Sequence, residues 1–435
     1  MTENTEQLRM TKLFAFFIPL GVSASLMTVS HVLINSTLAR ALQPEVVISS
    51  YAIAISLMTI MDRPLFLLRQ TCSVMVEDRR SFRSMWGVSL IVISTIFALN
   101  LLFAYSPIGH MILTYFFGVD YTLMQPTLNA YRILIFVCIF SGIRCLYQGI
   151  IIKQLRTKWI TIGMGIRLLG MYALSIWFIK TEQVNSGQVG AIIFLSGMII
   201  ECLVALLEGH KLSRRLPHAI RHRPAVTKTH IFNFYRPILY SSFIALFIGP
   251  SINALLGRTD NMELSIASYA IAFSVTNLVL SFFSYTHQIV LHFHQLDRQV
   301  VIRFVWLLSL APAILLGVLC YTSAGIWFLQ DVMGVSDRLM AECLNALRVF
   351  VMMAAVFPWL DYWNGRVMLS GKTKMMIWSQ GGNLAVTLIT LTICVVLSPG
   401  WNGAIGALAQ SLGVIAEMSI LLILLYATRK GLPAS

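Results

Sequence analysis

The segment Pro19–Arg40 reads PLGVSASLMTVSHVLINSTLAR, and the segment Pro237–Arg258 reads PILYSSFIALFIGPSINALLGR. The two segments align without a gap at an offset of 218 residues, and proline, asparagine and arginine stand at matching positions. The register continues into the next segment, where SYAIAIS at Ser50–Ser56 matches SYAIAFS at Ser268–Ser274. Because the offset is about half of the 435 residues, the sequence predicts two copies of one structural unit.

The repeat extends through the rest of each half at an offset of 216 residues. LNAYRI at Leu128–Ile133 matches LNALRV at Leu344–Val349, and Glu201 matches Glu417. Only a gap of two residues separates the two registers. One alignment therefore covers most of both halves.

The composition is that of a polytopic membrane protein. Of the residues, 57% are hydrophobic and only 11% are charged, whereas soluble domains carry about 25% charged residues. The apolar residues form continuous runs of the roughly 20 residues that a helix needs to cross a bilayer, and such runs indicate helices rather than the strands of a barrel. We therefore expect an all-α protein with twelve transmembrane helices. Their predicted ranges are 13–38, 47–75, 86–105, 127–150, 159–180, 187–208, 232–256, 264–292, 303–328, 342–367, 375–397 and 402–427.

Six helices is an even number, so the second half enters the membrane in the same direction as the first. The halves are then parallel repeats, as in transporters that hold their substrate between two halves and alternate access by rocking. We predict an N-terminal six-helix bundle at 1–208, a basic cytoplasmic linker at 209–231 and a C-terminal six-helix bundle at 232–435.

The loops carry an orientation signal. Twenty lysines and arginines fall in the loops of one side and four in the loops of the other, and the basic side of a membrane protein faces the cytoplasm. Both termini are then cytoplasmic, and the short loops favour a bacterial cell membrane. The net charge of +14 reports this topology and contact with the lipid bilayer rather than nucleic-acid binding. We expect a monomer.

The sequence gives no sign of an enzyme or of a cofactor. It lacks the Gly-x-x-x-x-Gly-Lys-Ser/Thr motif of nucleotide-driven pumps. Its seven cysteines are odd in number and lack metal-site spacing, so we predict neither a disulfide framework nor a metal centre. A histidine pair in the linker and three histidines near residue 290 are weak metal candidates for the same reason. Na⁺ or H⁺ coupling stays open.

Several stretches resemble the progressive ankylosis protein family and, more distantly, the multidrug and toxin extrusion (MATE) transporters of the polysaccharide and lipid flippase superfamily. The stretches are FFIPLGVS at Phe16–Ser23, SYAIAISLM at Ser50–Met58 followed by Pro64 and Arg69, MGVSDRLMAECLNALRVF at Met333–Phe350, SGKTK at Ser370–Lys374 and GALAQSLGVIAEMSILL at Gly406–Leu422.

The resemblance implies two six-helix bundles arranged in a V. For the ankylosis family it implies export of anionic metabolites such as nucleotide, citrate or pyrophosphate. For the MATE family it implies export of organic cations in exchange for Na⁺ or H⁺. MATE proteins often rely on a carboxylate in helix 1, whereas this chain has His31 and Asn35 there. The departure weakens the cation-exporter interpretation.

Charges inside the predicted helices are costly and call for a reason. Arg63, Arg144 and Arg167 outnumber the unpaired acids at similar depth, which favours an anionic substrate. Asp62 and Arg63 precede Pro64, where we predict that helix 2 is broken. Arg63 then binds an anion, or Asp62 forms a structural pair with a basic neighbour.

Other candidates have both a transport role and a structural alternative. Arg69 lines the cavity mouth or reaches lipid headgroups. Arg144 meets Asp361 across the repeat axis and locks one state, or it holds helices together statically. Glu201 and Glu417 carry protons or ions, or they are hydrogen-bonded packing devices.

The remaining candidates belong to the repeated core. Tyr51, Asn35 and Asn253 line the cavity or bond between helices, and the repeated pair Arg132 and Arg348 forms an outer gate or a structural contact.

The sequence thus leaves three transport functions open. The first is a secondary exporter of small anionic metabolites, and the second is a MATE-like exporter of cationic drugs. The third is a flippase for an anionic lipid-linked substrate. A non-transporting scaffold is the remaining alternative.

Overall fold

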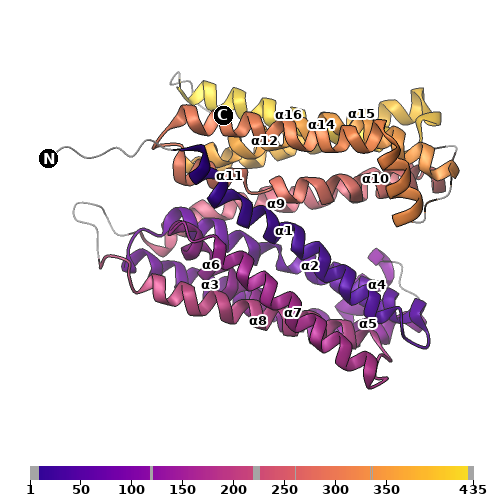
Figure 1. The fold of residues 1–435 in the computed structure, drawn as a ribbon, viewed down its shortest axis with the longest axis horizontal. Coiled ribbons are helices and arrows are strands. Elements are labelled where there is room, and N and C mark those ends of the chain that lie inside the picture. Colours follow the sequence, from indigo (N-terminus) through magenta and orange to yellow (C-terminus); the bar gives the residue numbers. More distant parts are fainter. Residues whose placement is uncertain are drawn as a thin grey trace. The chain divides into compact units, whose positions relative to one another are not determined.

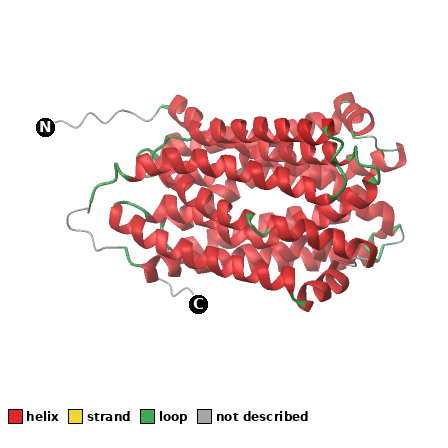
Figure 2. Cartoon of the chain, turned by 90° about the horizontal axis from the view of Figure 1, so that it is seen from below, coloured by secondary structure: helices red, strands yellow, loops and turns green. Residues whose placement is uncertain are grey.

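A computed structural model describes residues 9–117, 121–218, 226–259, 261–333, 335 and 337–429. These residues form helices and loops, with no strand in the described part of the chain (Figure 2). The helices in chain order are α1 (Met10–Leu38), α2 (Pro44–Met75), α3 (Arg79–Tyr105), α4 (Pro107–Phe117), α5 (Tyr121–Leu134), α6 (Val137–Lys153), α7 (Lys158–Lys180), α8 (Gly187–Ser213), α9 (Lys228–Leu256), α10 (Met262–Phe283), α11 (Thr286–Phe293), α12 (Arg298–Tyr321), α13 (Ser323–Trp327), α14 (Asp337–Leu369), α15 (Lys374–Leu397) and α16 (Gly403–Arg429) (Figure 1).

Twelve helical segments of the described chain are long and apolar enough to cross a bilayer, which confirms the all-α fold class. Two of them are interrupted. The fourth span consists of α5 and α6, separated at Ile135 and Phe136, and the eighth consists of α10 and α11, separated at Ser284 and Tyr285. The sequence predicted both spans as continuous, because neither interruption contains a glycine or a proline.

The predicted break in helix 2 is wrong. Helix α2 runs without interruption through Pro64. A proline removes one backbone hydrogen bond and its ring crowds the carbonyl group four residues earlier. Packing of α2 against α3, α5, α6 and α8 holds the helix on several sides and offsets this cost. The Tyr235 hydroxyl also donates to the Pro64 carbonyl oxygen at 2.9 Å.

The chain divides into two compact units, and the divisions fall inside α1 and α9. One unit holds Val22–Tyr235, and the other holds the described residues up to Gly21 together with those after Tyr235. In the second unit the Phe17 ring packs edge-on against Phe282, with centroids 5.7 Å apart. The predicted domain boundaries lie between helices because they separate the two copies of the sequence repeat. They describe the repeats and not the two compact units, and they stay a prediction.

The packing within each unit repeats residue by residue. A Cβ on Gly190 would lie 2.9 Å from the Tyr51 ring, and one on Gly406 would lie 2.7 Å from the Tyr269 ring. These glycines and tyrosines are repeat equivalents, so each half needs a residue without a side chain at the same helix crossing. The sequence repeat is therefore also a repeat of contacts.

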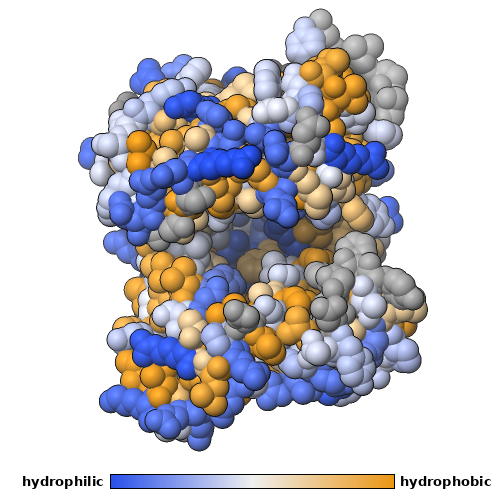
Figure 3. All heavy atoms as spheres, turned by 90° about the vertical axis from the view of Figure 1, so that its right-hand side faces the viewer, coloured by the Kyte–Doolittle hydropathy of each residue, from blue (hydrophilic) through white to orange (hydrophobic). Residues whose placement is uncertain are grey.

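The surface suits a protein that spans a bilayer. Large apolar side chains are exposed along the spans, among them Ile91, Leu169 and Trp306. Figure 3 shows the molecule end-on, from the end at which α4 and α5 lie, and there hydrophilic and hydrophobic residues are mixed. Mixed surfaces of this kind are expected where helices leave the lipid for water.

Candidate functional site

A buried ion-pair cluster lies inside the unit formed by Val22–Tyr235. Its centre is the Glu201 carboxylate on α8. The Arg144 guanidinium on α6 donates to Glu201 Oε1 at 2.8 Å, and the Arg167 guanidinium on α7 donates to Oε2 at 2.8 Å. Gln148 donates its side-chain nitrogen to Oε1 at 2.9 Å. Three helices therefore meet at one carboxylate.

The local sequence explains how these side chains come together. Arg144 and Gln148 are four residues apart, so they lie on the same face of α6. Gly197 lies one turn before Glu201, and a Cβ there would lie 2.6 Å from the Met171 sulfur and 3.2 Å from the Arg167 side chain. The glycine thus lets α7 approach α8 closely enough for Arg167 to reach Glu201.

The cluster holds more positive charge than Glu201 can neutralise. The side chains of Arg144, Arg167 and Glu201 are 3%, 0% and 2% exposed. Arg144 Nε and both Nε and Nη2 of Arg167 have no hydrogen-bond partner in the described part of the chain. An unpartnered charged donor in a low-dielectric interior is costly, so these nitrogens are positions where an anion would be stabilised.

Aromatic rings cover the guanidinium groups. Arg144 lies 5.2 Å from the centre of the Phe66 ring, and Arg167 lies 5.2 Å from that of Phe194. Cations are attracted to the faces of aromatic rings at such distances. His31 of α1 stacks on the same Phe194 ring, with centroids 5.6 Å apart, so the helix-1 histidine lies beside the cluster.

Asp62 lies on α2 and makes a different bond from those predicted. Ser141 donates its hydroxyl to Asp62 Oδ2 at 2.7 Å, whereas Oδ1 has no partner among the described residues. Arg63, the next residue, is exposed. Asp62 is therefore a buried carboxylate that is hydrogen-bonded rather than ion-paired.

The equivalent site in the second unit has no cation at its centre. Glu417 on α16 is 7% exposed, and Asn383 of α15 donates its amide to Oε2 at 2.7 Å. With the Gln380 amide nitrogen turned toward Glu417, that nitrogen lies 2.9 Å from Oε1 and 3.2 Å from Oε2. The repeat puts Asn383 where the first half has Arg167, and Leu360 where it has Arg144. Two equivalent carboxylates therefore differ in their described partners, which are cationic for Glu201 and neutral for Glu417.

Asp361 pairs within its own unit. It accepts from the backbone nitrogen of His287 at 2.8 Å and lies 3.0 Å from the ring nitrogen Nδ1 of the same residue. Gln288 continues the chain of contacts, with its amide nitrogen 3.0 Å from His287 Nε2. Asp361 thus binds the start of α11, where the eighth span is interrupted. Arg144 likewise pairs within its own unit, with Glu201, and the contact between Arg144 and Asp361 stays a prediction.

Of the other predicted candidates, only Arg69 has a described contact with a residue of these clusters. Arg69 donates to Gln148 Oε1 at 3.4 Å. Tyr51 is buried and its hydroxyl has no partner in the described residues, whereas Asn35 and Asn253 are exposed.

The repeated arginines have matching surroundings. Arg132 donates to Asn129 at 3.1 Å and lies over Tyr105, and Arg348 donates to Asn345 at 3.1 Å and lies over Tyr321.

The structure adds two residues that the sequence did not single out, Gln148 and Gln380. Gln148 could have been found from its one-turn spacing to Arg144 on a single face, but Gln380 carries no comparable signal. His287, which the sequence offered only as a weak metal candidate, is the partner of Asp361.

No group of three or more potential metal ligands occurs in the described residues. Of the predicted histidines, His294 follows the eighth span, and burial lowers its pKa to about 4, with repulsion from Arg366 and Arg298 acting in the same direction. His218 contacts Arg79, and its predicted partner in the linker lies outside the described residues.

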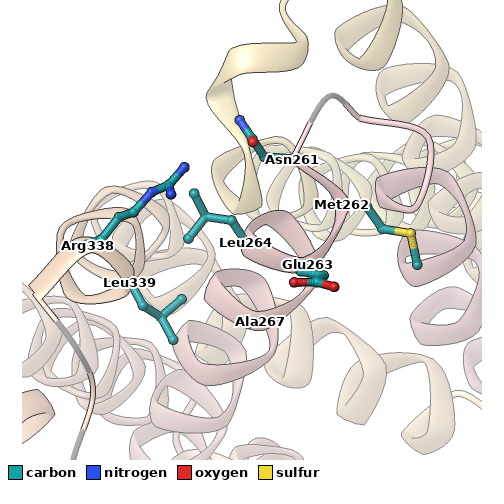
Figure 4. Close-up of a pocket in the computed structure, with 7 residues that line it drawn as sticks. All are labelled: Asn261, Met262, Glu263, Leu264, Ala267, Arg338 and Leu339. Carbon is teal, nitrogen blue, oxygen red and sulfur yellow. The ribbon is translucent and has the colours of Figure 1, made fainter.

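A separate cavity of about 580 Å³ lies where α10 and α14 begin. Figure 4 shows Arg338 and Leu339 of α14 on one side and residues 261–267 on the other. None of the predicted site residues lines it, and Arg338 belongs to the less basic side of the predicted topology. We assign it no role in the interior site.

Solved structures share the fold, and three of them show the extent of the likeness. A MOP superfamily transporter from Pyrococcus furiosus, described as having a binding pocket of reverse polarity, is 15% identical, with a TM-score of 0.73 over 99% of this chain and 98% of that one. The Vibrio cholerae MATE transporter VcmN in its bent form is 15% identical, with a TM-score of 0.75 over 97% of both chains. The eukaryotic MATE transporter AtDTX14 is 14% identical, with a TM-score of 0.75 over 96% of this chain and 95% of that one.

Comparison with protein families adds a match over the first part of the chain. Residues 1–166 match the family model of the progressive ankylosis protein, and no curated protein matches the chain. The chain is thus a multi-pass membrane protein that resembles the progressive ankylosis protein family over residues 1–166 and has the fold of the MATE transporters of the MOP superfamily over nearly its whole length.

Proposed function

We propose that this protein is a secondary active transporter that exports small anionic metabolites, such as citrate, a nucleotide or pyrophosphate, by alternating access. The shared fold supports transport as the general activity. The resemblance to the progressive ankylosis protein family over residues 1–166 favours an anionic cargo, because export of anionic metabolites is what that resemblance implies. We also propose that it acts as a monomer in a bacterial cell membrane with both termini in the cytoplasm, as the loop charges indicate.

The single observation that carries the choice of an anion is the Arg144–Glu201–Arg167 cluster. Two guanidinium groups face one carboxylate, and three of their nitrogens have no partner among the described residues. A substrate carboxylate or phosphate can accept two parallel hydrogen bonds from one guanidinium. Such an anion would replace Glu201 as the partner of Arg167. Arg167 would then be paired with the substrate, and Glu201 would stay paired with Arg144.

The same cluster explains how binding could be reversible. Glu201 shares its carboxylate between the two arginines while no substrate is bound, which leaves one excess positive charge rather than two. When an anion replaces it at Arg167, Glu201 keeps Arg144 and Gln148 as partners. The bound anion then supplies the negative charge that balances the second guanidinium.

A second candidate function rests on Glu417. Its described partners are amides and not cations, so this carboxylate could take up a proton or Na⁺. In a MATE-like exporter of organic cations it would be the coupling group. The proposed anion exporter can use the same residue for coupling, so Glu417 separates the candidates only when the cargo is also measured. A flippase for an anionic lipid-linked substrate is the third candidate, and it requires a lipid-sized cargo.

The neighbour from Pyrococcus furiosus is described as having a binding pocket of reverse polarity that suggests a different function. That description supports the view that the charge of the site can differ among proteins of one fold. The charge of the cargo therefore has to be inferred from the residues of the site, because the fold does not determine it.

The test is efflux from proteoliposomes loaded in parallel with labelled citrate, ATP and a cationic dye, each with and without Na⁺ and H⁺ gradients. We expect movement of an anion and no movement of the dye. Dye efflux that requires an ion gradient, with no anion movement, would replace this proposal by the MATE-like one. Empty liposomes give the leak of each compound.

A further inference from the structure

A second basic site lies where α3 begins and α8 ends. It is a pocket of about 310 Å³, between the helix ends that the loop charges place on the cytoplasmic side. Helices α3 and α8 both pack against α6 there (Figure 1). Its lining residues are Arg79, Phe82, Arg83, Trp86, Tyr147, His210, Ser213 and Arg214.

The helical spacing of these residues directs them into the pocket. Arg79, Arg83 and Trp86 are four and three residues apart, so they share one face of α3. His210 and Arg214 are four residues apart and share one face of α8. The two faces converge on the Tyr147 ring of α6, whose centroid lies 6.0 Å from that of Phe82 and 6.2 Å from that of Trp86.

Arg79 fixes the shape of the pocket through its hydrogen bonds. Arg79 donates its Nε to the Leu216 carbonyl oxygen at 3.0 Å and another guanidinium nitrogen to the carbonyl oxygen of Arg214. Its backbone nitrogen donates to the Pro217 carbonyl oxygen at 3.0 Å. These bonds fix the segment that follows α8 against the start of α3, so the pocket has a defined shape.

The other basic side chains are available to a ligand. Arg83, His210 and Arg214 are exposed, and no acidic residue is among the described residues that line the pocket. Lys228 adds charge, because its Cε lies 2.6 Å from the position that a Cβ on Gly87 would take, beside Trp86. The nearby Asp78 carboxylate is used to cap α3, where it accepts from the Ser81 backbone nitrogen at 2.7 Å.

The aromatic residues indicate the depth of the site. Trp86 is seven residues into α3, or about 10 Å along the helix at 1.5 Å per residue, and tryptophan is enriched where a membrane meets water. Basic pockets between helices on the cytoplasmic side are suited to anionic head groups. The pocket thus combines cationic donors at its mouth with an aromatic floor.

We propose that this pocket binds a phosphate group, carried by the head group of an anionic phospholipid or by a free phosphate ion. Arg83 and Arg214 bind the phosphate oxygens from opposite walls, and Trp86 and Tyr147 contact the apolar part of a lipid ligand. This site is separate from the Arg144–Glu201–Arg167 cluster, so it does not depend on which cargo the protein transports.

The test measures binding to the detergent-purified full chain with two probes. Native mass spectrometry counts phosphatidylglycerol adducts against phosphatidylcholine adducts, and calorimetric titration measures inorganic phosphate. The variant Arg83→Gln/Arg214→Gln is compared with Arg80→Gln/Arg215→Gln, because both remove two charges at the same helix ends and residues 80 and 215 do not line the pocket.

General attraction to anionic lipid is worth about fivefold in affinity per basic residue, and both variants lose it equally. We expect the pocket variant to lose at least about a further tenfold, since charge-assisted hydrogen bonds are the strong ones. Loss with phosphatidylglycerol identifies a lipid head group, and loss with inorganic phosphate identifies a free anion. Equal binding by the two variants, or no binding of either probe by the wild-type protein, would overturn the proposal. Thermal unfolding of each variant checks that both are folded.

Discussion

Replacing Glu201 by glutamine should destabilise the protein far more than replacing Glu417 by glutamine. The two residues occupy equivalent positions of the repeat, and both are buried. Glu201 accepts from two guanidinium groups at 2.8 Å each, whereas Glu417 accepts from amides. The pair of substitutions is therefore a matched experiment in which the chain supplies its own control.

The magnitude follows from what each substitution leaves behind. Glu201→Gln leaves Arg144 and Arg167 in the interior without a counter-charge, and its new amide nitrogen can face a guanidinium as donor against donor. Breaking a buried ion pair by removing one partner costs about 3–5 kcal/mol. Glu417→Gln removes no ion pair and sacrifices at most one acceptor, which is worth about 1 kcal/mol. We expect a difference of at least about 2 kcal/mol between the two variants.

The assay is reversible unfolding of each variant in mixed detergent micelles, followed by helical circular dichroism. The double variant Glu201→Gln/Arg167→Asn then gives the first half the asparagine that the second half has at the equivalent position, Asn383. Because it removes one uncompensated charge, it should recover part of the lost stability. If Glu201→Gln and Glu417→Gln lose equal amounts of unfolding free energy, or if adding Arg167→Asn lowers it further, uncompensated buried charge is not the cause of the instability.

Three further predictions concern packing and titration. Gly149→Ala places a methyl group 2.6 Å from a cysteine Cβ and 2.8 Å from a backbone carbonyl oxygen of α2, and should lower the free energy of unfolding by about 1–3 kcal/mol. Gly165→Ala on α7 is its control, because a methyl group there meets nothing within 4 Å. It should be neutral or slightly stabilising in the same unfolding assay. Asp361→Ala leaves the backbone nitrogen and ring of His287 without their acceptor and should cost about 1–3 kcal/mol; an unchanged unfolding midpoint would show that this contact is dispensable. Because the pKa of His294 is lowered to about 4, the unfolded chain binds the extra proton first, so stability should fall as the pH drops from about 6.5 toward 4; His294→Gln should reduce this fall, and an identical pH dependence would contradict it.

The sequence predicts the fold because length and repetition suffice for it. Twelve apolar runs and one internal alignment predict twelve helices in two copies, and neither requires knowledge of side-chain direction. The breaks in the fourth and eighth spans escape this reasoning. Ile135, Phe136, Ser284 and Tyr285 include no helix breaker, and the eighth break is accompanied by a tertiary contact from Asp361 to the start of α11. Pro64 illustrates the converse, since tertiary packing keeps α2 continuous.

The interior charges were identifiable, but their partners were not. Each residue turns the helix face by about 100°, so an error of one position in a helix end changes which neighbour an arginine meets. The repeat suggested Arg144 beside Asp361, and nothing in the sequence indicated that Arg144 on α6 pairs with Glu201 on α8. Gly197 allows α7 to approach α8, and its consequence for Arg167 depends on the packing of several helices at once.

We propose that the first half binds an anion through Arg167 while the second half holds a carboxylate for coupling. The decisive measurement is counterflow of labelled citrate and ATP in proteoliposomes, without any ion gradient, for wild type, Arg167→Asn and Glu417→Gln. Asparagine is the residue that the repeat itself has at this position, and Glu201 keeps Arg144, so we expect the Arg167 variant to fold. We expect Arg167→Asn to abolish counterflow of the anion, whereas Glu417→Gln retains it and loses only gradient-driven efflux. Undiminished anion counterflow in Arg167→Asn would show that Arg167 does not bind the anion.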